Sequence, residues 1–513
     1  MIGSKELIER VLDAASWEPW DKPVPGVRAS GEYGAALDRA RHATGLDEAV
    51  VTGSGAIGGH RVAVIATEFS FLAGSVGMAA SRRIIHAVEQ ATTERIPVVA
   101  SPASGGTRLQ EGTLAFVQMI GIASALAAHR AAGLPYLVYL RDPTTGGVLA
   151  SWGSLGHVTA AEPGALIGLL GPRVQHALYD EPLPPGIQTA ENLYTHGLID
   201  AVVSPSDLRD VAIRVLSVLN APRRSAPADS PVGSTDQSNT VPPSLSSSPS
   251  GADGTWGSVV RSRRPDRPGV RSLLKIAASD VTLLSGTGAG ERDDALVLAL
   301  ARFGKIPSVV LGQDRGHQTA NDALGPAGLR EAVRGVRLAS DLNLPLVTVI
   351  DTPGAPLSRH SEESGLASGI AWCLAELSIL PAPTVCVLLG QGGGGTALAL
   401  LPADRVLCAE HAWLAPLPPE GASEALYRTT NRASDVAHAQ RIGSEALVQD
   451  GIADMVIPEL PDAADEPEQF LRRVSMILEA ELRDLAAADP NERLAARTAR
   501  FRAAVANQPS TDA

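Results

Sequence analysis

The chain has 513 residues and a hydrophobic fraction of 44%, which predicts a globular protein of about two domains. A net charge of −13 argues against nucleic acid or an anionic membrane surface as the main partner, because both bind clustered positive charge. The three cysteines, Cys373, Cys386 and Cys408, lie in apolar runs and are expected to be buried, reduced thiols. No stretch approaches the ~20 continuous apolar residues of a membrane span, and the N-terminus has no apolar signal core, so we expect a cytoplasmic protein.

Short apolar runs bounded by turn residues recur along both halves of the chain. In the first half they lie at 62–67, 97–101, 136–140 and 165–170. In the second half they lie at 306–311, 346–350, 384–389 and 405–408. Such runs, alternating with helical segments, are typical of parallel strands that helices cover on both faces. The sequence therefore predicts an α/β fold in each half.

A stretch rich in serine and proline separates the two halves. Between 221 and 260 these two residue types fill 16 of 40 positions, and so few apolar residues cannot offset the entropy cost of ordering the chain. We expect domains at 1–220 and 261–460, a flexible linker at 221–260, and a charged helical tail at 461–513.

The halves also repeat one succession of features. The first runs strand, Ala103–Gly106, long helix, strand and Asp142–Gly147; the second runs strand, Asp351–Ala355, long helix, strand and Gly390–Thr396. This order indicates a duplicated βαβ-type unit with a glycine cluster at the same place in each copy. The alternative is that α/β proteins in general alternate strands, glycine turns and helices.

Two glycine motifs have the spacing of nucleotide sites but lack their context. Gly53–Gly58 matches the dinucleotide-binding pattern, yet the strand at 61–67 follows it where a helix should begin, so we expect a hairpin turn. Gly390–Thr396 has phosphate-loop spacing without the lysine that neutralises phosphate. No Cys or His pair has metal-ligand spacing, and nothing in the spacing of Ser104, His157 and Asp142 requires a catalytic triad.

Two glycine-rich turns between strand and helix remain, at Thr145–Val148 and Gly394–Ala397. The first N–H groups of a helix have no intrahelical acceptor and favour negative charge. Glycine lets a substrate oxygen approach those donors closely, and stabilisation of an enolate or similar oxyanion is worth about 3–4 kcal/mol per donor. The alternative is that the glycines only permit tight packing of helix on sheet, and the residue pattern alone leaves both readings open.

Longer motifs resemble a known family in both halves. The first half resembles the β subunit of bacterial acetyl-CoA carboxylase carboxyltransferase, in Phe71–Gly77, Ser104–Glu111, Asp142–Gly147, Ala161–Pro163, Gly171–Val174 and Leu183–Gln188. The second half resembles the α subunit, in Arg263–Pro268, Ile350–Ala355, Gly390–Ala399, Pro419–Gly421 and Asp454–Pro458. The chain thus resembles a natural fusion of two subunits that are usually separate.

The resemblance implies a crotonase-like fold in each half, with acyl-CoA mainly against the first and carboxybiotin mainly against the second. It implies that the amides of Gly146 and Gly147 hold the thioester enolate oxygen and those of Gly395 and Thr396 hold the biotin ureido oxygen. It further implies substrate-binding roles for Gly105, Gly106 and Arg108, and cofactor-binding roles for Gly393 and Gly394. No metal is expected, and biotin itself would carry the proton and CO2 chemistry.

The sequence departs from the family pattern at several places. No cysteine precedes Cys373, so the four-cysteine zinc ribbon of the β subunit is absent. Thr396 replaces the second glycine of the α-type pair, and its β-branched side chain is expected to narrow the approach. His157 stands where the β pattern has Asp, and the basic stretch expected after Gly312 is short and mostly neutral.

The chain contains no Met-Lys-Met biotinylation motif and no ATP-grasp domain, so carboxybiotin is expected to arrive on a separate carrier charged by a separate biotin carboxylase. The family implies a homodimer that carboxylates acetyl-CoA or another short acyl-CoA, giving malonyl-CoA from acetyl-CoA for fatty acid biosynthesis. Two other readings stay open: a malonate-decarboxylase-type enzyme, and a catalytically weakened homologue that scaffolds a carboxylase complex.

Overall fold

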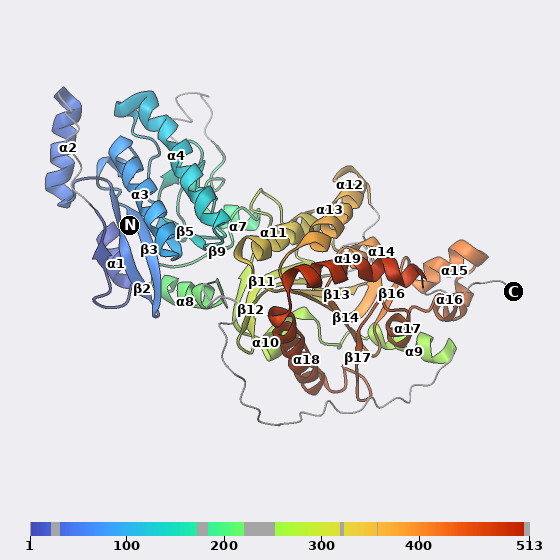
Figure 1. The fold of residues 1–513 in the computed structure, drawn as a ribbon. Coiled ribbons are helices and arrows are strands. Elements are labelled where there is room, and N and C mark those ends of the chain that lie inside the picture. Colours follow the sequence, from blue (N-terminus) through green and yellow to red (C-terminus); the bar gives the residue numbers. More distant parts are fainter. Residues whose placement is uncertain are drawn as a thin grey trace, which may run out of the picture.

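The computed structural model describes residues 2–21, 31–171, 183–219, 252–318, 323–355 and 358–506. Each half of the chain is built on its own mixed sheet, and the two halves lie side by side (Figure 1). The first sheet has seven strands in the order β1-β2-β3-β4-β5-β7-β9, and the second has eight in the order β10-β11-β12-β13-β14-β15-β17, with β16 paired to β14.

The first half has these strands: β1 (Glu18–Pro19), β2 (Val50–Ile57), β3 (His60–Thr67), β4 (Val98–Ser101), β5 (Tyr136–Leu140), β6 (Thr144–Thr145), β7 (Val158–Ala161), β8 (Ile167–Gly168) and β9 (Ala201–Val202). Its helices are α1 (Ser4–Val11), α2 (Gly31–Thr44), α3 (Met78–Glu94), α4 (Gly112–Ala131), α5 (Gly146–Leu149), α7 (Ala190–Thr195) and α8 (Leu208–Leu219). Strands β6 and β8 pair with each other outside the main sheet.

The second half has these strands: β10 (Ser279–Leu284), β11 (Leu296–Phe303), β12 (Ile306–Gln313), β13 (Leu346–Thr352), β14 (Thr384–Gly393), β15 (Arg405–Ala409), β16 (Trp413–Ala415) and β17 (Met455–Ile457). Its helices are α9 (Ala252–Ser262), α10 (Val270–Ala277), α11 (Pro326–Leu342), α12 (Arg359–Glu363), α13 (Leu366–Ile379), α14 (Gly394–Leu398), α15 (Pro419–Tyr427), α16 (Ala433–Ala439), α17 (Ser444–Gln449), α18 (Pro467–Ala487) and α19 (Pro490–Ala506).

The two sheets share one topology. In the first, β2 and β3 form an antiparallel hairpin, after which β4, β5, β7 and β9 add in parallel. In the second, β11 and β12 form the hairpin, and β13, β14, β15 and β17 add in parallel. Seven of the eight apolar runs form strands with parallel partners in the main sheets, whereas the run at 165–170 forms only the short β8, which pairs with β6 outside them. The matched strand order supports the duplication. A hairpin turn was expected at Gly53–Gly58 in the first half, whereas the hairpin of β11 and β12 in the second half was not expected, because every apolar run there was interpreted as a parallel strand.

The glycines of the supposed hairpin turn lie mostly within a strand. Gly53 and Gly55 belong to β2, and only Gly58 with Gly59 makes the turn. A Cβ on Gly53 would lie 2.4 Å from the carbonyl oxygen of Glu18, so β1 can pair there only because the side chain is missing. The dinucleotide spacing therefore reflects close strand packing.

The expected boundaries of the linker and the tail differ from the structure. Residues 252–260 of the predicted linker are part of α9, while 220–251 lie outside the described residues. In the predicted tail, Phe470, Val474 and Leu478 of α18 are buried in the largest core cluster. Helix α18 therefore belongs to the second domain, since its apolar face covers that domain's sheet.

Helix α8 joins the two halves, because it lies between the two sheets and packs on both (Figure 1). Leu208, Val215 and Leu219 of this helix share one core cluster with Leu298 and Leu300 of β11. Ion pairs add to the contact: Arg334 binds Asp200 at 2.8 Å, and Arg130 binds Asp341 at 2.8 Å. The halves therefore form a continuous hydrophobic and charged interface.

Helix α4 buries only part of its apolar surface. It packs on α3, yet Leu109 just before it and Leu114, Phe116 and Ile120 within it are all more than 60% exposed. The segment Leu109–Ala131 is the one helix among the described residues that is long and apolar enough to cross a membrane, although 28% of it is buried in the protein. The sequence-based expectation had excluded any such segment. One helix of this kind is weak evidence for a span, because core and interface helices share its composition.

Candidate functional site

The first glycine loop follows β5 and meets the loop that follows β4. Gly106, with φ of 103°, packs so closely on it that a Cβ there would lie 3.2 Å from the Thr145 carbonyl oxygen and 3.4 Å from the Gly147 nitrogen. Gly146 also has a positive φ, of 65°, which suits glycine. The structure thus brings Gly105, Gly106, Gly146 and Gly147 together, as the sequence predicted.

Three of these four amides already have acceptors. Gly105 donates to the Ala73 carbonyl at 2.8 Å, and Gly106 donates to Ser104 Oγ at 3.0 Å. Gly146 donates to the Leu169 carbonyl at 3.0 Å. Gly147, in the first turn of α5 and half-buried, is the one of the four whose amide has no acceptor among the described residues. The available donor of this loop is therefore Gly147, rather than Gly146 and Gly147 equally.

Arg108 has a different place from the one the family motif implied. It is 1% exposed, donates to Glu48 from both terminal nitrogens, and donates to the Ser75 carbonyl at 2.7 Å. Its guanidinium also lies 5.7 Å from the Phe71 ring centroid. With its donors used inside the protein, Arg108 fixes the chain beneath the first loop in place of the expected substrate contact.

The second glycine loop repeats this arrangement after β14. A Cβ on Gly393 would lie 2.3 Å from the Pro353 carbonyl oxygen, so this glycine packs against the loop after β13. Gly394 has a φ of 67° and lies close to Gly354 and to the Pro416 carbonyl. Gly393 and Gly394 therefore form the close contact between neighbouring loops that Gly106 and Gly146 form in the first half.

The amides of Gly395 and Thr396 lie in the first turn of α14, where the helix supplies no acceptor. Gly395 is partly exposed, whereas Thr396 is fully buried and its Oγ1 has no hydrogen-bond partner. The threonine side chain thus lies beneath the loop. The expected narrowing of the approach by its β-branch stays a prediction, and Gly395 is the more exposed of the two residues.

Charged side chains behind the second loop are paired internally. Asp351, at the end of β13, accepts from the Gln391 amide at 3.0 Å and from Arg315 at 2.9 Å, and burial raises the pKa of its carboxyl. His317 Nδ1 lies 2.8 Å from Asp314. The basic residues after Gly312 therefore stabilise the protein behind the second glycine loop. Sequence reasoning treated this segment only as a weakened anion contact and overlooked its structural part.

His157 keeps the contact that an aspartate makes in the other half. In the second half, Asp404 precedes β15 and accepts from the Thr384 amide at 2.8 Å; in the first half, His157 precedes β7 and its Nδ1 accepts from the Tyr136 amide at 3.0 Å. Burial lowers the pKa of His157, which suits a neutral ring with an unprotonated Nδ1. Ser104, His157 and Asp142 share no hydrogen bond, so no triad forms.

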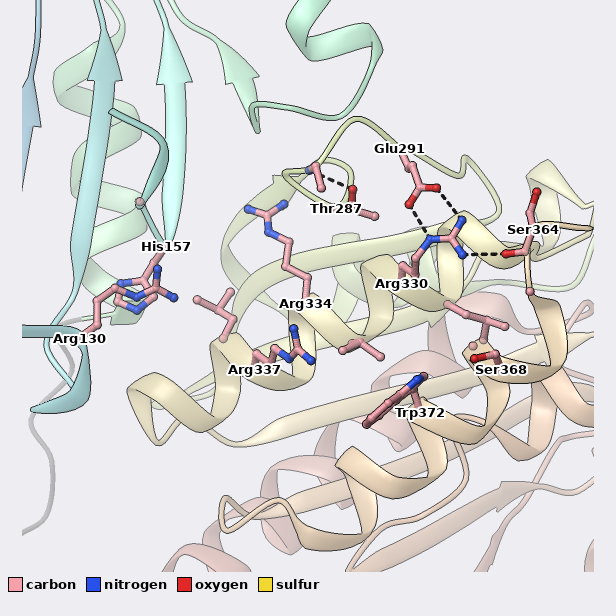
Figure 2. A pocket seen from close by; sticks show the side chains of 17 residues that line it. Arg130, His157, Thr287, Glu291, Arg330, Arg334, Arg337, Ser364, Ser368 and Trp372 are labelled. Carbon is pink, nitrogen blue, oxygen red and sulfur yellow. Dashed lines mark hydrogen bonds and ion pairs between the residues drawn. The ribbon is translucent and has the colours of Figure 1, made fainter. Parts of the chain in front are cut away.

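A cavity of about 540 Å³ lies between the halves and apart from both glycine loops. Figure 2 shows Arg330 and Arg334 of α11 and Trp372 of α13 along one side, with Arg130 and His157 of the first half opposite. Arg330 binds Glu291 at 2.5 Å and 2.6 Å. None of the predicted site residues lines this cavity.

Acidic side chains balance the positive charge of this cavity. Arg130, Arg330, Arg334 and Arg337 pair in turn with Asp341, Glu291, Asp200 and Glu376. The cavity therefore has no excess of charge for an anion; two of its ion pairs, those of Arg130 and Arg334, join the halves, and the other two lie within the second half.

A model of one protein family, described as the carboxyl transferase domain, matches residues 8–494. The chain belongs to this family. It is a carboxyltransferase.

Curated relatives agree over nearly the whole chain. The sequence is 55% identical over 502 residues to a probable biotin-dependent acyl-coenzyme A carboxylase beta3 subunit of Mycobacterium tuberculosis (strain ATCC 25618 / H37Rv), covering 98% of each protein. It is 40% identical over 452 residues to the acetyl-coenzyme A carboxylase carboxyl transferase subunits beta/alpha of Salinispora arenicola (strain CNS-205), covering 86% of this chain and 79% of the relative.

Solved structures agree at the level of the fold. Transcarboxylase 12S, described as a hexamer with methylmalonyl-coenzyme A bound, superposes with a TM-score of 0.71 at 22% identity and covers 93% of this chain and 90% of its own. A single-chain, multi-domain long-chain acyl-CoA carboxylase gives a TM-score of 0.68 at 18% identity, covering 92% of this chain and 45% of its own.

Proposed function

We propose that this protein is the carboxyltransferase component of a biotin-dependent acyl-CoA carboxylase, and that it moves the carboxyl group from carboxybiotin to acetyl-CoA or another short acyl-CoA. The observation that carries the proposal is the repeated glycine loop. Each half places free backbone amides after equivalent strands, β5 and β14. The reaction develops negative charge on one oxygen of each reactant, so it needs two such sites.

In the first loop, Gly147 donates to the enolate oxygen of the acyl-CoA thioester. A well-placed donor of this kind lowers the barrier by about 3–4 kcal/mol. Gly146 contributes its left-handed backbone, since its own amide is engaged by Leu169. Gly105 and Gly106 line the approach, and Arg108 below them keeps the loop in place.

In the second loop, Gly395 and Thr396 donate to the ureido oxygen of biotin, while Gly393 and Gly394 let the ring approach the backbone. The residues fit this group, because the amides of Gly395 and Thr396 have no acceptor within the helix and Gly395 is partly exposed. Carboxybiotin, when bound, supplies the carboxyl group and a nitrogen that can accept the α-proton. The protein then needs to orient the two reactants and hold their oxygens.

The name of the Mycobacterium tuberculosis relative, a biotin-dependent carboxylase subunit, supports biotin as the cofactor. We infer that a carrier protein delivers it and that a biotin carboxylase on another chain charges it. With acetyl-CoA the product is malonyl-CoA, the precursor for fatty acid biosynthesis. The duplicated topology supports a crotonase-like fold in each half, and the name of the beta/alpha relative supports a β–α fusion. We propose that this fusion does without the zinc ribbon, because no cysteine precedes Cys373. No group of three metal-ligating side chains occurs in the described part of the chain.

We further propose that the protein acts as a homodimer in the cytoplasm. The exposed apolar face of α4, formed by Leu114, Phe116 and Ile120, is the kind of surface that a partner subunit covers. The buried, reduced state of the three cysteines fits a reducing compartment.

The test uses purified protein, charged biotinyl carrier and a panel of acyl-CoAs, with the carboxylated product measured by chromatography. Product from acetyl-CoA or propionyl-CoA supports the proposal and names the substrate. Inactivity with every acyl-CoA, together with CO2 release from a malonyl thioester, would instead support a decarboxylase. Inactivity in both assays would support a scaffold.

A further inference from the structure

Gln313 is the last residue of β12 and is completely buried. Its amide group makes two hydrogen bonds that join three segments. Nε2 donates to the carbonyl oxygen of Thr396 at 2.8 Å, and Oε1 accepts from the amide of Asp351 at 3.1 Å. One side chain therefore connects β12, the end of β13 and the first turn of α14.

The carbonyl of Thr396 needs this partner because α14 is short. Ala399 donates to Gly395 and Leu400 donates to Ala397, so no described backbone amide reaches the Thr396 oxygen between them. A buried carbonyl without a partner is costly. The Gln313 bond therefore fixes the orientation of the peptide groups around Thr396.

The first half joins its strand ends differently: buried Arg141, just after β5, donates to the carbonyls of Thr67 and Ser101 at the ends of β3 and β4, and the two loops also bond directly through the backbone. Thr145 donates to the Ser104 carbonyl at 2.9 Å, and Ser104 donates to the Pro143 carbonyl at 2.6 Å. The strand-end residue equivalent to Gln313 is Thr67, whose hydroxyl bonds only to Ala103 in the nearer loop. Both halves thus join these segments through the main chain, in the second half by the pairing of Thr352 with Gly392, and in the second half the strand-end side chain of Gln313 also bonds to the glycine-loop carbonyl itself.

We propose that Gln313 is a positioning residue for carboxyl transfer, which orients the amides of Gly395 and Thr396 toward carboxybiotin and leaves the acyl-CoA side unaffected. The inference rests on the proposed function. The effect of Gln313 should be confined to the second half, because Gln313 contacts Thr396 and Asp351, while the loop of Gly147 belongs to the other sheet.

Two variants separate the bonds. Gln313→Met has a similar shape and loses both, and Gln313→Glu keeps the acceptor for Asp351 but loses the donor to Thr396. The matched control is Ser308→Ala on the same strand, because Ser308 is equally buried and its Oγ has no partner. Initial rates are measured against charged biotinyl carrier and against acyl-CoA, and acyl-CoA binding is measured by calorimetry.

Both Gln313 variants are expected to lose at least 10-fold in kcat/KM for the carrier, with the Kd for acyl-CoA within 2-fold of wild type. Ser308→Ala is expected to match wild type in both. Wild-type carrier kinetics in Gln313→Glu, or an equal loss on the acyl-CoA side, would overturn the proposal.

Amide hydrogen exchange tests the structural role of Gln313 independently of the reaction. Gln313→Met is expected to raise amide exchange in 394–400 and to leave 146–150 unchanged. If the wild type transferred no carboxyl group, the proposed function would fail while the exchange result still decided the structural claim. Unchanged exchange in 394–400 would overturn it.

Discussion

His157 Nε2 lies 3.7 Å from Asp341 Oδ2, across the boundary between the two halves of the chain. Its Nδ1 accepts from the Tyr136 amide at 3.0 Å, so that nitrogen must stay unprotonated. Arg130 binds the same aspartate at 2.8 Å, and the nearby His157 ring and the Arg130 guanidinium lower the pKa of Asp341. The histidine therefore connects the strand β5 to the contact between the halves.

Acid is expected to weaken the folded protein through this histidine. Burial lowers the pKa of His157, so the unfolded chain binds the proton more readily, and its contribution to stability is lost as the pH falls below about 6.5. His157→Asn keeps an acceptor for Tyr136 and cannot titrate. The free energy of unfolding in urea is measured for this variant and for wild type from pH 8 to pH 5. The slope against pH should be smaller in the variant than in wild type, by at most about 1.4 kcal/mol per pH unit.

His129 serves as an internal reference, because burial lowers its pKa to about 4 and it remains in both proteins. Parallel pH profiles for wild type and His157→Asn would show that His157 does not contribute.

Glu331 should have the opposite dependence on pH. Burial raises its pKa to about 7; Oε1 accepts from the Gly286 amide at 2.9 Å, and Oε2 has no hydrogen-bond partner. The folded chain holds this proton more tightly, so stability is lost as the pH rises from about 4.5 through 7. At pH 8 the free energy of unfolding of Glu331→Gln should be about 1–3 kcal/mol higher than that of wild type, and below pH 4.5 the two proteins should differ little. A variant less stable than wild type at pH 8 would contradict this.

Gly147→Val tests the first loop. A Cβ at Gly147 would lie 2.8 Å from Thr107 Oγ1, a side chain that can move, so the fold should survive while the branched residue blocks the oxyanion position. Carboxyl transfer should fall by about 100-fold or more, the effect of losing one such donor. Gly257→Val is the control, since a Cβ there meets nothing within 4 Å. Equal turnover in the two variants, both with wild-type melting temperatures, would rule out the role given to Gly147.

Thr396→Val tests whether the second loop needs the hydroxyl of Thr396 or only its backbone amide. Valine keeps the shape and the backbone amide but removes the buried, unpartnered Oγ1. The variant should be as stable as wild type or up to about 1 kcal/mol more stable, and its turnover should stay within about 2-fold. A large loss of turnover in steady-state assays would mean that the hydroxyl itself contacts a reactant.

Much of the fold could be predicted because the strands that form the sheets are continuous apolar runs. The run at 136–140 became β5, and that at 346–350 became most of β13. Strand β2 was missed because Gly53 and Gly55 have the local pattern of a turn, and only the tertiary packing of β1 on them explains their place in a strand. The family motifs likewise placed all four first-half glycines, which do meet.

The hydrogen-bonding state of the loops could not be predicted. Whether an amide is free depends on partners far along the chain: Leu169 engages Gly146, and Gln313 engages the Thr396 carbonyl. Arg108 resembled a substrate ligand because its motif did, and only its burial against Glu48 shows the structural role. The orientation of the Thr396 side chain also needed coordinates, since a first-turn residue can face either side of its helix.

The central claim is that the protein passes one carboxyl group between two glycine loops. The most direct test follows the label of a ¹⁴C-carboxylated biotinyl carrier mixed with the full chain and acetyl-CoA or propionyl-CoA. The account predicts that acid-stable label appears in the carboxylated acyl-CoA, and that Gly147→Val abolishes this transfer. Label that stays on the carrier, or leaves only as CO2 with every acyl-CoA, would contradict the account.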